Sequence, residues 1–229
     1  MTLTPEEWQA VWLTLAVAAR AVGCGLPLAV IAAWVLTRCR FPGRGVLNAL
    51  VHLPMVLPPV VTGWLLLVLF GVHGPAGVLL DRWFGIRLAF TTAGAALAVG
   101  VMTFPIMVRS IRLSLEAVDR GLEQAARTLG AGPFDRLFNV TLPLASPGIL
   151  VGAVVAYATC LGEFGAVITF AGSIPGQTQT LPLAIFSALQ VPGGEAKAAE
   201  LSLVSLVLAS IGLLLSEWLN KLLSGVLGR

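Results

Sequence analysis

The sequence predicts an all-α integral membrane protein built as a single domain over residues 1–229, and three observations support this. Of the 229 residues, 57% are hydrophobic and 11% are charged, whereas a soluble domain carries about 25% charged residues. The mean hydropathy is +0.93. The apolar residues form several runs of about 20 residues or more, the length that an α-helix needs to cross a bilayer. We therefore expect about five transmembrane helices.

The apolar runs define the expected elements in chain order. The expected spans cover residues 8–36, 46–71, 89–108, 145–170 and 198–219. The first run lacks a basic leader and is longer than a signal-peptide core, so we expect a retained span. Residues 181–191 are apolar but too few to cross about 30 Å at about 1.5 Å per residue. We expect them to form a cap or a re-entrant helix. A polar segment at 110–142 separates the third span from the fourth.

The basic residues predict the orientation, because short cytoplasmic loops retain Lys and Arg. Alternate loops place one group of basic residues on the side of the first loop: Arg38, Arg40, Arg44, Arg109, Arg112, Arg120, Arg127, Arg136, Lys221 and Arg229. The other side holds only Arg82, Arg87 and Lys197, while Arg20 lies within a span. This asymmetry predicts an external N-terminus, a cytoplasmic C-terminus and a cytoplasmic polar segment.

Small residues and prolines inside the spans suggest how the helices pack. Gly148, Gly152 and Ala156 follow one another at four-residue spacing, as do Gly94 and Ala98. Such rows allow close helix approach in lipid, so we expect packing faces within one subunit or between two copies.

Several residues in the spans are candidates for a transport pathway or for helix bends. A proline removes a backbone donor, and such breaks can line a pathway or simply kink a helix. Glu163 is an ionisable residue deep in the fourth span, so it either faces the pathway or is a structural carboxylate bonded to the backbone or to a basic partner. The candidates are Pro54, Pro58, Pro59, Glu163, Phe164 and Gly165.

The sequence argues against an enzyme. It has no G-x-x-x-x-G-K-[ST] phosphate-binding loop, no nucleophile–base pair and no metal-ligand spacing among its three cysteines and two histidines. We therefore expect no metal and no bound cofactor, and no basic tract indicates nucleic acid. Energy for any transport must come from a partner that hydrolyses ATP or from an ion gradient.

The polar segment resembles the EAA loop of ABC importer permeases. The consensus is E-A-A, three residues, Gly, nine residues, Ile, one residue and Leu-Pro, and the matching residues are Gln124, Ala125, Ala126, Gly130, Val140, Leu142 and Pro143. Gln124 takes the usual Glu position, and Glu123 precedes it. In that family the loop forms a coupling helix that docks on a separate cytoplasmic ATPase. The resemblance thus implies an ATPase-coupling loop with Glu123, Gln124, Ala125, Ala126, Arg127, Leu129, Gly130, Leu142 and Pro143.

The whole chain is similar to permeases of molybdate importers, most clearly at residues 52–61, 161–166 and 192–195. This resemblance implies the ABC importer permease (MetI-like) fold in the bacterial inner membrane. It also implies two copies of this chain, two ATPase subunits that hold ATP and magnesium, and an extracytoplasmic molybdate-binding protein. The expected activity is alternating-access import of molybdate or tungstate.

Three alternatives remain open. The segment at 162–166 is shared with sulfate-type permeases, so an importer for sulfate or thiosulfate is the first. An ion-gradient-driven anion carrier is the second, although one membrane carboxylate and no visible inverted repeat give it thin support. A membrane scaffold without transport is the third.

Overall fold

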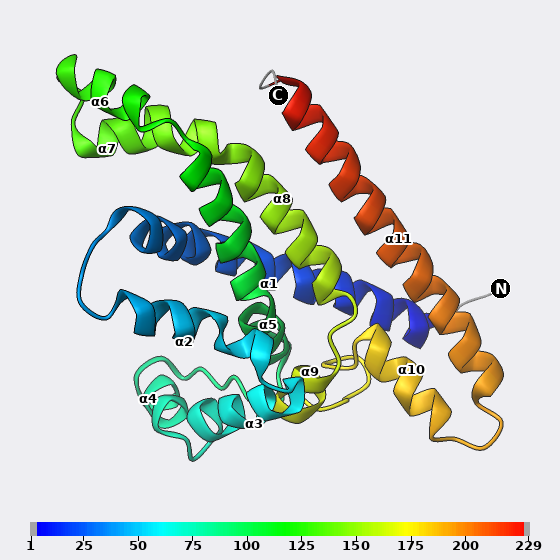
Figure 1. Cartoon of the computed structure of the whole chain (residues 1–229). Coiled ribbons are helices and arrows are strands. Elements are labelled where there is room, and N and C mark those ends of the chain that lie inside the picture. Colours follow the sequence, from blue (N-terminus) through cyan, green and yellow to red (C-terminus); the bar gives the residue numbers. More distant parts are fainter. Residues whose placement is uncertain (1–3, 227–229) are drawn as a thin grey trace.

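The regular elements of the computed structural model, which describes residues 4–226, are all helices (Figure 1). Their bounds are α1 Pro5–Arg38, α2 Arg44–Val56, α3 Pro59–Phe70, α4 Pro75–Phe84, α5 Thr92–Ala117, α6 Arg120–Thr128, α7 Pro133–Arg136, the π-helical turn η1 Leu137–Thr141, α8 Leu142–Cys160, α9 Gly165–Phe170, α10 Leu181–Leu189 and α11 Glu195–Val226. The helices α6 and α7 lie at one end of the molecule, and α3, α4, α9 and α10 lie toward the other (Figure 1).

Four helical stretches of the described chain are long and apolar enough to cross a membrane. They are α1, α5, the continuous stretch Pro133–Cys160 and residues Glu195–Leu215 of α11. The pair α2 and α3 passes the same test only together and is bent by 118°. The expected count of about five therefore requires the bent pair to be one span. The bend falls at Pro58 and Pro59, two of the prolines named as candidates for helix bends in the expected span over 46–71. Neither proline can donate a backbone hydrogen bond, and Leu57 adopts an extended conformation before them.

Two other expected boundaries differ from the structure. The helix α5 continues to Ala117, so the polar segment begins inside a helix; Arg112 on its last turns donates to Asn48 Oδ1 of α2 at 2.6 Å. The fourth span ends at Cys160 and not near 170, because the chain turns at residues 161–164 and restarts as the separate short helix α9. Apolar composition alone does not mark such a break.

The centre of the fold is made by α1, α5 and α8, whose buried residues form one apolar cluster. Small residues allow this contact, as expected from the glycine row. A Cβ on Gly148 would collide with the Cβ of Ser114, and a Cβ on Gly152 would lie 3.0 Å from the Cβ of Ser110. Ser110 Oγ donates to the carbonyl of Gly148 at 2.9 Å. The predicted packing face on α8 is confirmed, and it meets α5 of the same chain.

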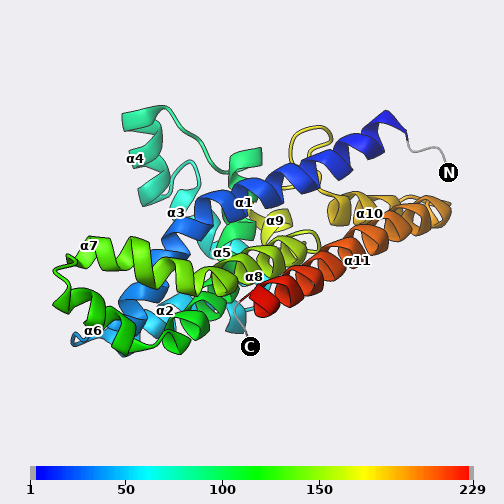
Figure 2. The ribbon, with the colours of Figure 1, turned by 90° about the horizontal axis from the view of Figure 1, so that it is seen from above.

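The N-terminal half of α1 holds α10 and α11 in place. The backbone N–H of Leu181, at the start of α10, donates to Thr14 Oγ1 at 2.7 Å. Glu7 pairs with Lys197 at the start of α11, with 3.2 Å between Oε1 and Nζ. The helix α10 has nine residues, which confirms that this segment is too short to span. Figure 2 shows α10 and α11 beside the N-terminal part of α1.

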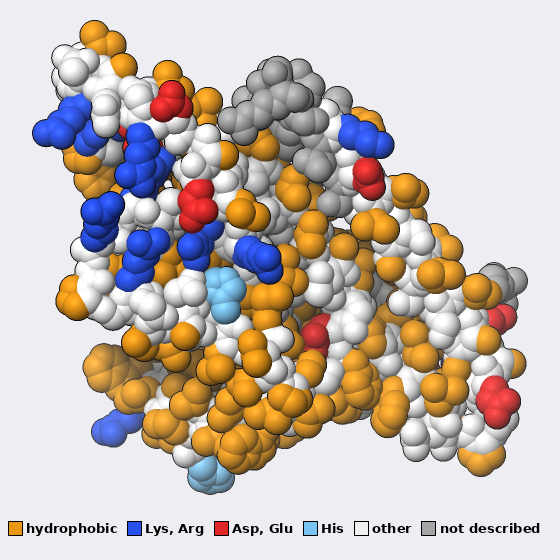
Figure 3. All heavy atoms as spheres, viewed as in Figure 1, with side chains coloured by type: hydrophobic (Ala, Val, Ile, Leu, Met, Phe, Trp, Pro, Cys, Tyr) orange, Lys and Arg blue, Asp and Glu red, His pale blue; other side chains and the backbone are white. Residues whose placement is uncertain are grey.

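The surface separates apolar from basic regions. Large apolar side chains are exposed along α2, α3 and α11, as expected for helices that face lipid. Lys and Arg side chains gather toward the end that carries α6 and α7 (Figure 3). Arg229, which we counted among the basic residues, lies outside the described residues.

Candidate functional site

The helix α6 has well-defined ends that the local sequence explains. Asp119 is its N-cap, and its carboxylate accepts the backbone N–H of Gly121 at 2.8 Å. At the other end Gly130 has φ of 88°. Its N–H donates to Arg127 O at 3.1 Å, and the N–H of Ala131 donates to Ala126 O at 3.0 Å. This is the Schellman arrangement, which favours glycine because a side chain is strained at positive φ.

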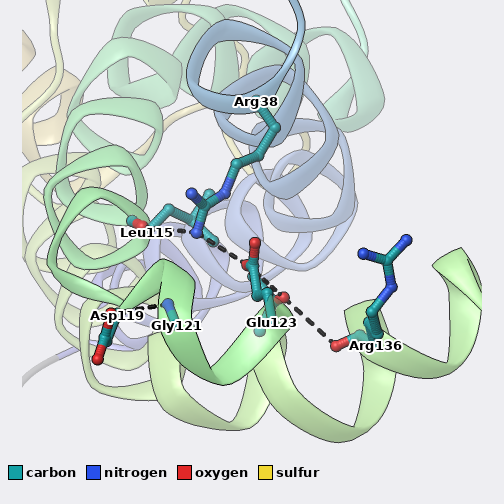
Figure 4. Close-up of polar contacts among 7 residues, drawn as sticks. Arg38, Leu115, Asp119, Gly121, Glu123 and Arg136 are labelled. Atoms are coloured by element: carbon teal, nitrogen blue, oxygen red, sulfur yellow. Dashed lines mark hydrogen bonds and ion pairs between the residues drawn. The ribbon is translucent and has the colours of Figure 1, made fainter. Parts of the chain in front are cut away.

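One ion pair attaches α6 to the membrane helices (Figure 4). Arg38 Nη2, at the end of α1, lies 2.9 Å from Glu123 Oε1 and also donates to Leu115 O of α5 at 3.2 Å. Thr141 Oγ1 of η1 donates to the same Glu123 oxygen at 2.8 Å. The side chains of Arg38 and Glu123 are only 12% and 21% exposed. Three elements, α1, α6 and η1, therefore meet at one carboxylate, and Arg38 links them to α5.

The predicted coupling residues divide into two groups. Glu123 points inward to the ion pair, whereas Gln124, Ala125 and Arg127 are exposed. Within the described chain, no residue of α6 is buried. Gln124 at the usual Glu position is thus a surface residue, and the carboxylate one position earlier makes the internal contact.

The outer surface of this end carries large apolar side chains that nothing in the described chain covers. Leu129 is 88% exposed, and Phe134 on α7 is 75% exposed. Leu122 and Phe138 are also exposed. Leu142 and Pro143 begin α8 directly after η1, so they join this surface to a membrane helix. Exposed apolar groups among basic residues indicate a surface for a partner.

The candidate pathway residues form a second group away from α6. A Cβ on Gly165 would lie 2.7 Å from the Cβ of Pro59, so the breaks in the second and fourth expected spans meet at α3 and α9. Glu163 Oε1 accepts the backbone N–H of Ala166 at 3.1 Å, and no cation pairs with it in the described chain. This agrees with a carboxylate bonded to the backbone. Phe164 packs on Phe186 of α10, with ring centroids 5.1 Å apart.

Pro54 belongs to neither group. It lines an apolar cavity of about 590 Å³ between α1, α2 and α5, together with Arg20 and Phe104. Across residues 4–226, no three His, Cys, Asp or Glu side chains are placed to hold a metal ion.

Sequence reasoning missed the roles of Arg38, Thr141 and Asn48. Arg38 was one of several basic residues after the first span, and 85 positions separate it from Glu123. No local pattern connects residues so far apart. The only available sign was a polar or charged residue at the end of an apolar run.

Comparison with known proteins shows the fold class and the family of this chain. The fold resembles the bacterial alginate ABC transporter solved with an alginate pentasaccharide-bound periplasmic protein; the TM-score is 0.73 with 16% identity, over 95% of this chain and 81% of that chain. The fold is that of an ABC importer permease. Residues 25–225 match the family described as binding-protein-dependent transport system inner membrane component, and the chain belongs to this family.

Two relatives match this chain over almost its whole length. The molybdenum transport system permease protein ModB of Escherichia coli (strain K12) is 56% identical over 222 residues, 97% of each chain. The ModB of Haemophilus influenzae is 49% identical over 223 residues, again 97% of each chain.

Proposed function

We propose that this chain is the permease subunit of an ATP-driven importer of molybdate, with tungstate as a second substrate. The observation that carries the proposal is the 56% identity to a molybdenum permease over 97% of both chains. The working assembly contains two copies of this chain, two cytoplasmic ATPase subunits that bind ATP and magnesium, and an extracytoplasmic binding protein that selects the oxyanion. The N-terminus is external, and α6 and the C-terminus face the cytoplasm.

The helix α6 is the coupling helix in this proposal. Its exposed residues Gln124, Ala125 and Leu129 form the surface that the ATPase holds, while Arg127 of the same loop lies on the side of α6 that carries Glu123. Closure of the two ATPase subunits on ATP moves the two copies of α6 together. Because Glu123 binds both Arg38 and Thr141, that movement reaches α1 and α8 directly. Opening of the pathway follows from the rearrangement of these helices, and ATP hydrolysis resets it.

The bends at Pro58–Pro59 and at Glu163–Gly165 lie on the pathway side of the subunit in this proposal. Broken helices at membrane depth are tolerated where they are buried in protein or line a cavity. Glu163 shapes the start of α9 through the Ala166 hydrogen bond, since a carboxylate is a poor ligand for an anion. Selection of the anion is left to the binding protein.

The test of the substrate is uptake of labelled molybdate by cells with and without this chain, with excess tungstate or excess sulfate. Loss of uptake on deletion, with block by tungstate and not by sulfate, is the expected result. Block by sulfate assigns the chain to a sulfate-type importer. The chain is a gradient-driven carrier if uptake depends on it, needs no ATPase and stops when an uncoupler is added. Normal uptake without the chain favours a scaffold.

The test of docking is the Leu129→Asp variant. Leu129 packs on little of its own chain, so the fold is expected to persist while the ATPase no longer co-purifies and uptake falls. Val191→Asp is the matched control, because Val191 is 61% exposed in a loop remote from α6. Equal co-purification of the ATPase with both variants would contradict the docking role.

A further inference from the structure

A polar cavity of about 530 Å³ lies on the inner side of α6, between the end of α1, α7 and η1. Its lining includes four arginines, one acid and one tryptophan, namely Arg38, Arg120, Arg127, Arg136, Glu123 and Trp34. Its volume is in the range of small-molecule sites, about 300–1,000 Å³. The pathway candidates at α3 and α9 do not line it.

The positive charge of this cavity is not balanced by the described chain. Glu123 is paired with Arg38. Arg120 and Arg127 make no ion pair with any residue in the range 4–226, and Arg136 donates only to the carbonyl of Gly132, at 3.4 Å. The neighbouring acids are used elsewhere, because Asp119 caps α6 and Asp135 accepts from Asn139. Three guanidinium groups therefore surround this space without a counter-charge.

A second observation concerns Arg38. Its Nε is buried and has no hydrogen-bond partner among the described residues, although its side chain is 12% exposed. A buried donor without an acceptor is costly, so the ion pair with Glu123 does not satisfy every donor of the Arg38 guanidinium. Figure 4 shows the Arg38 and Glu123 side chains pointing toward each other, with Arg136 beside them on the neighbouring helix.

We propose that this cavity binds one tetrahedral oxyanion group, a phosphate or an anion of the same shape and charge. Arginine forks donate paired hydrogen bonds to the oxygens of such groups. The anion bridges α1 through Arg38, α6 through Arg120 and Arg127, and α7 through Arg136. It thereby fixes α6 against the membrane helices and determines how strongly movement of α6 is coupled to movement of these helices.

Two sources supply this chemistry at the proposed membrane edge, namely the headgroup of an anionic lipid and a free anion of the cytoplasm. The experiment uses the full chain in nanodiscs of phosphatidylcholine and, separately, of phosphatidylglycerol. Binding of ³²P-phosphate is measured at constant ionic strength, together with thermal unfolding. The measurement does not require transport, so its failure is separate from failure of the proposed import function.

The expected result in phosphatidylcholine is one saturable phosphate site per chain. Arg120→Gln and Arg127→Gln each weaken it at least about tenfold, as loss of a charge-assisted hydrogen bond predicts. Both side chains are exposed and unpaired, so the variants are expected to fold. Arg40→Gln is the matched control, because Arg40 is also exposed but does not line the cavity, and it is expected to bind normally.

The lipid comparison identifies the source. If a headgroup occupies the cavity, phosphatidylglycerol raises the unfolding temperature and excludes free phosphate, and Arg127→Gln removes both effects. If a free anion occupies it, phosphate binds equally in both lipids. The proposal is overturned if phosphate shows no saturable binding and phosphatidylglycerol has no arginine-dependent effect. Equal binding by Arg127→Gln and Arg40→Gln also overturns it, and would leave the cavity to an acidic residue of a partner protein.

Discussion

Glu123 is the residue that turns an exposed helix into a fixed part of the fold. Few contacts within the chain hold α6, and the carboxylate of Glu123 accepts from both Arg38 and Thr141. A charge-assisted hydrogen bond is about twice as strong as a neutral one. Since its partners belong to α1 and η1, this one side chain decides where α6 stands relative to the membrane helices.

Replacing Glu123 tests this attachment. Glu123→Ala leaves Arg38 without its carboxylate, and we expect the free energy of unfolding to fall by about 2 kcal/mol. Uptake is expected to fall as well, because α6 loses its direct connection to α1. Glu116→Ala is the control, since Glu116 also pairs with an arginine but is 50% exposed, and exposed pairs contribute about 0–1 kcal/mol. Denaturation in detergent micelles measures the free energy of unfolding of both variants. Equal losses of stability in Glu123→Ala and Glu116→Ala would contradict the attachment.

Gly130 tests the turn that ends α6. At φ of 88° an alanine is strained by about 1–2 kcal/mol, although no atom lies within 4 Å of the added Cβ. Gly130→Ala is therefore expected to destabilise the chain without a clash. Gly132→Ala has equal open space and φ of −66°, so it is expected to be nearly neutral. Similar unfolding midpoints for the two variants would show that the turn is not constrained.

At the scale of elements, the contact of α5 with α8 organises the membrane part of the molecule. Lipid removes most of the hydrophobic driving force between helices, so close packing of small residues and interhelical hydrogen bonds hold them together. Gly148 and Ser110 supply both, through backbone approach and the 2.9 Å hydrogen bond. The same principle places Gly165 against Pro59, where α9 meets α3.

Gly148→Ala tests the α5–α8 contact. The added methyl group has no room beside Ser114, and overpacking costs about 1–3 kcal/mol. Gly23→Ala in α1 is the matched change, because nothing lies within 4 Å of its Cβ. At that position the better helix propensity of alanine is expected to raise the free energy of unfolding by up to about 1 kcal/mol. We expect the unfolding midpoint to fall in Gly148→Ala and to rise in Gly23→Ala. A rise in Gly148→Ala would refute close packing at this site.

At the scale of the whole molecule, we expect the distribution of charge and the number of spans to determine the orientation of the chain in the membrane. The basic residues gather toward the end that carries α6 (Figure 3), and from the positive-inside tendency we expect that end in the cytoplasm. With the four long spans and the bent α2–α3 pair, we expect the N-terminus outside.

Reporter fusions test this orientation. A reporter that is active only in the cytoplasm is expected to be active when inserted after Gly132 and inactive when inserted after Gly193. Both sites are loop glycines with open space, so both insertions are expected to be tolerated. Activity at both sites, or only after Gly193, would contradict the proposed topology.

Many features of this protein follow from its amino-acid sequence alone. Apolar run lengths gave the long spans, because a helix must be about 20 residues long to cross lipid. The four-residue spacing on α8 gave a packing face, and the motif from Gln124 to Pro143 located α6 and the family. These features are local, since each depends on helix periodicity or on a short fixed spacing.

Other features became visible only in the folded chain. It showed the 118° bend between α2 and α3, the break after Cys160, and the pairing of Arg38 with Glu123 across 85 positions. It also gathered arginines from three helices around one cavity. The physical reason is the same in each case. These features depend on which distant segments pack together, and helix periodicity describes only the face of one helix, not the side chain that meets it.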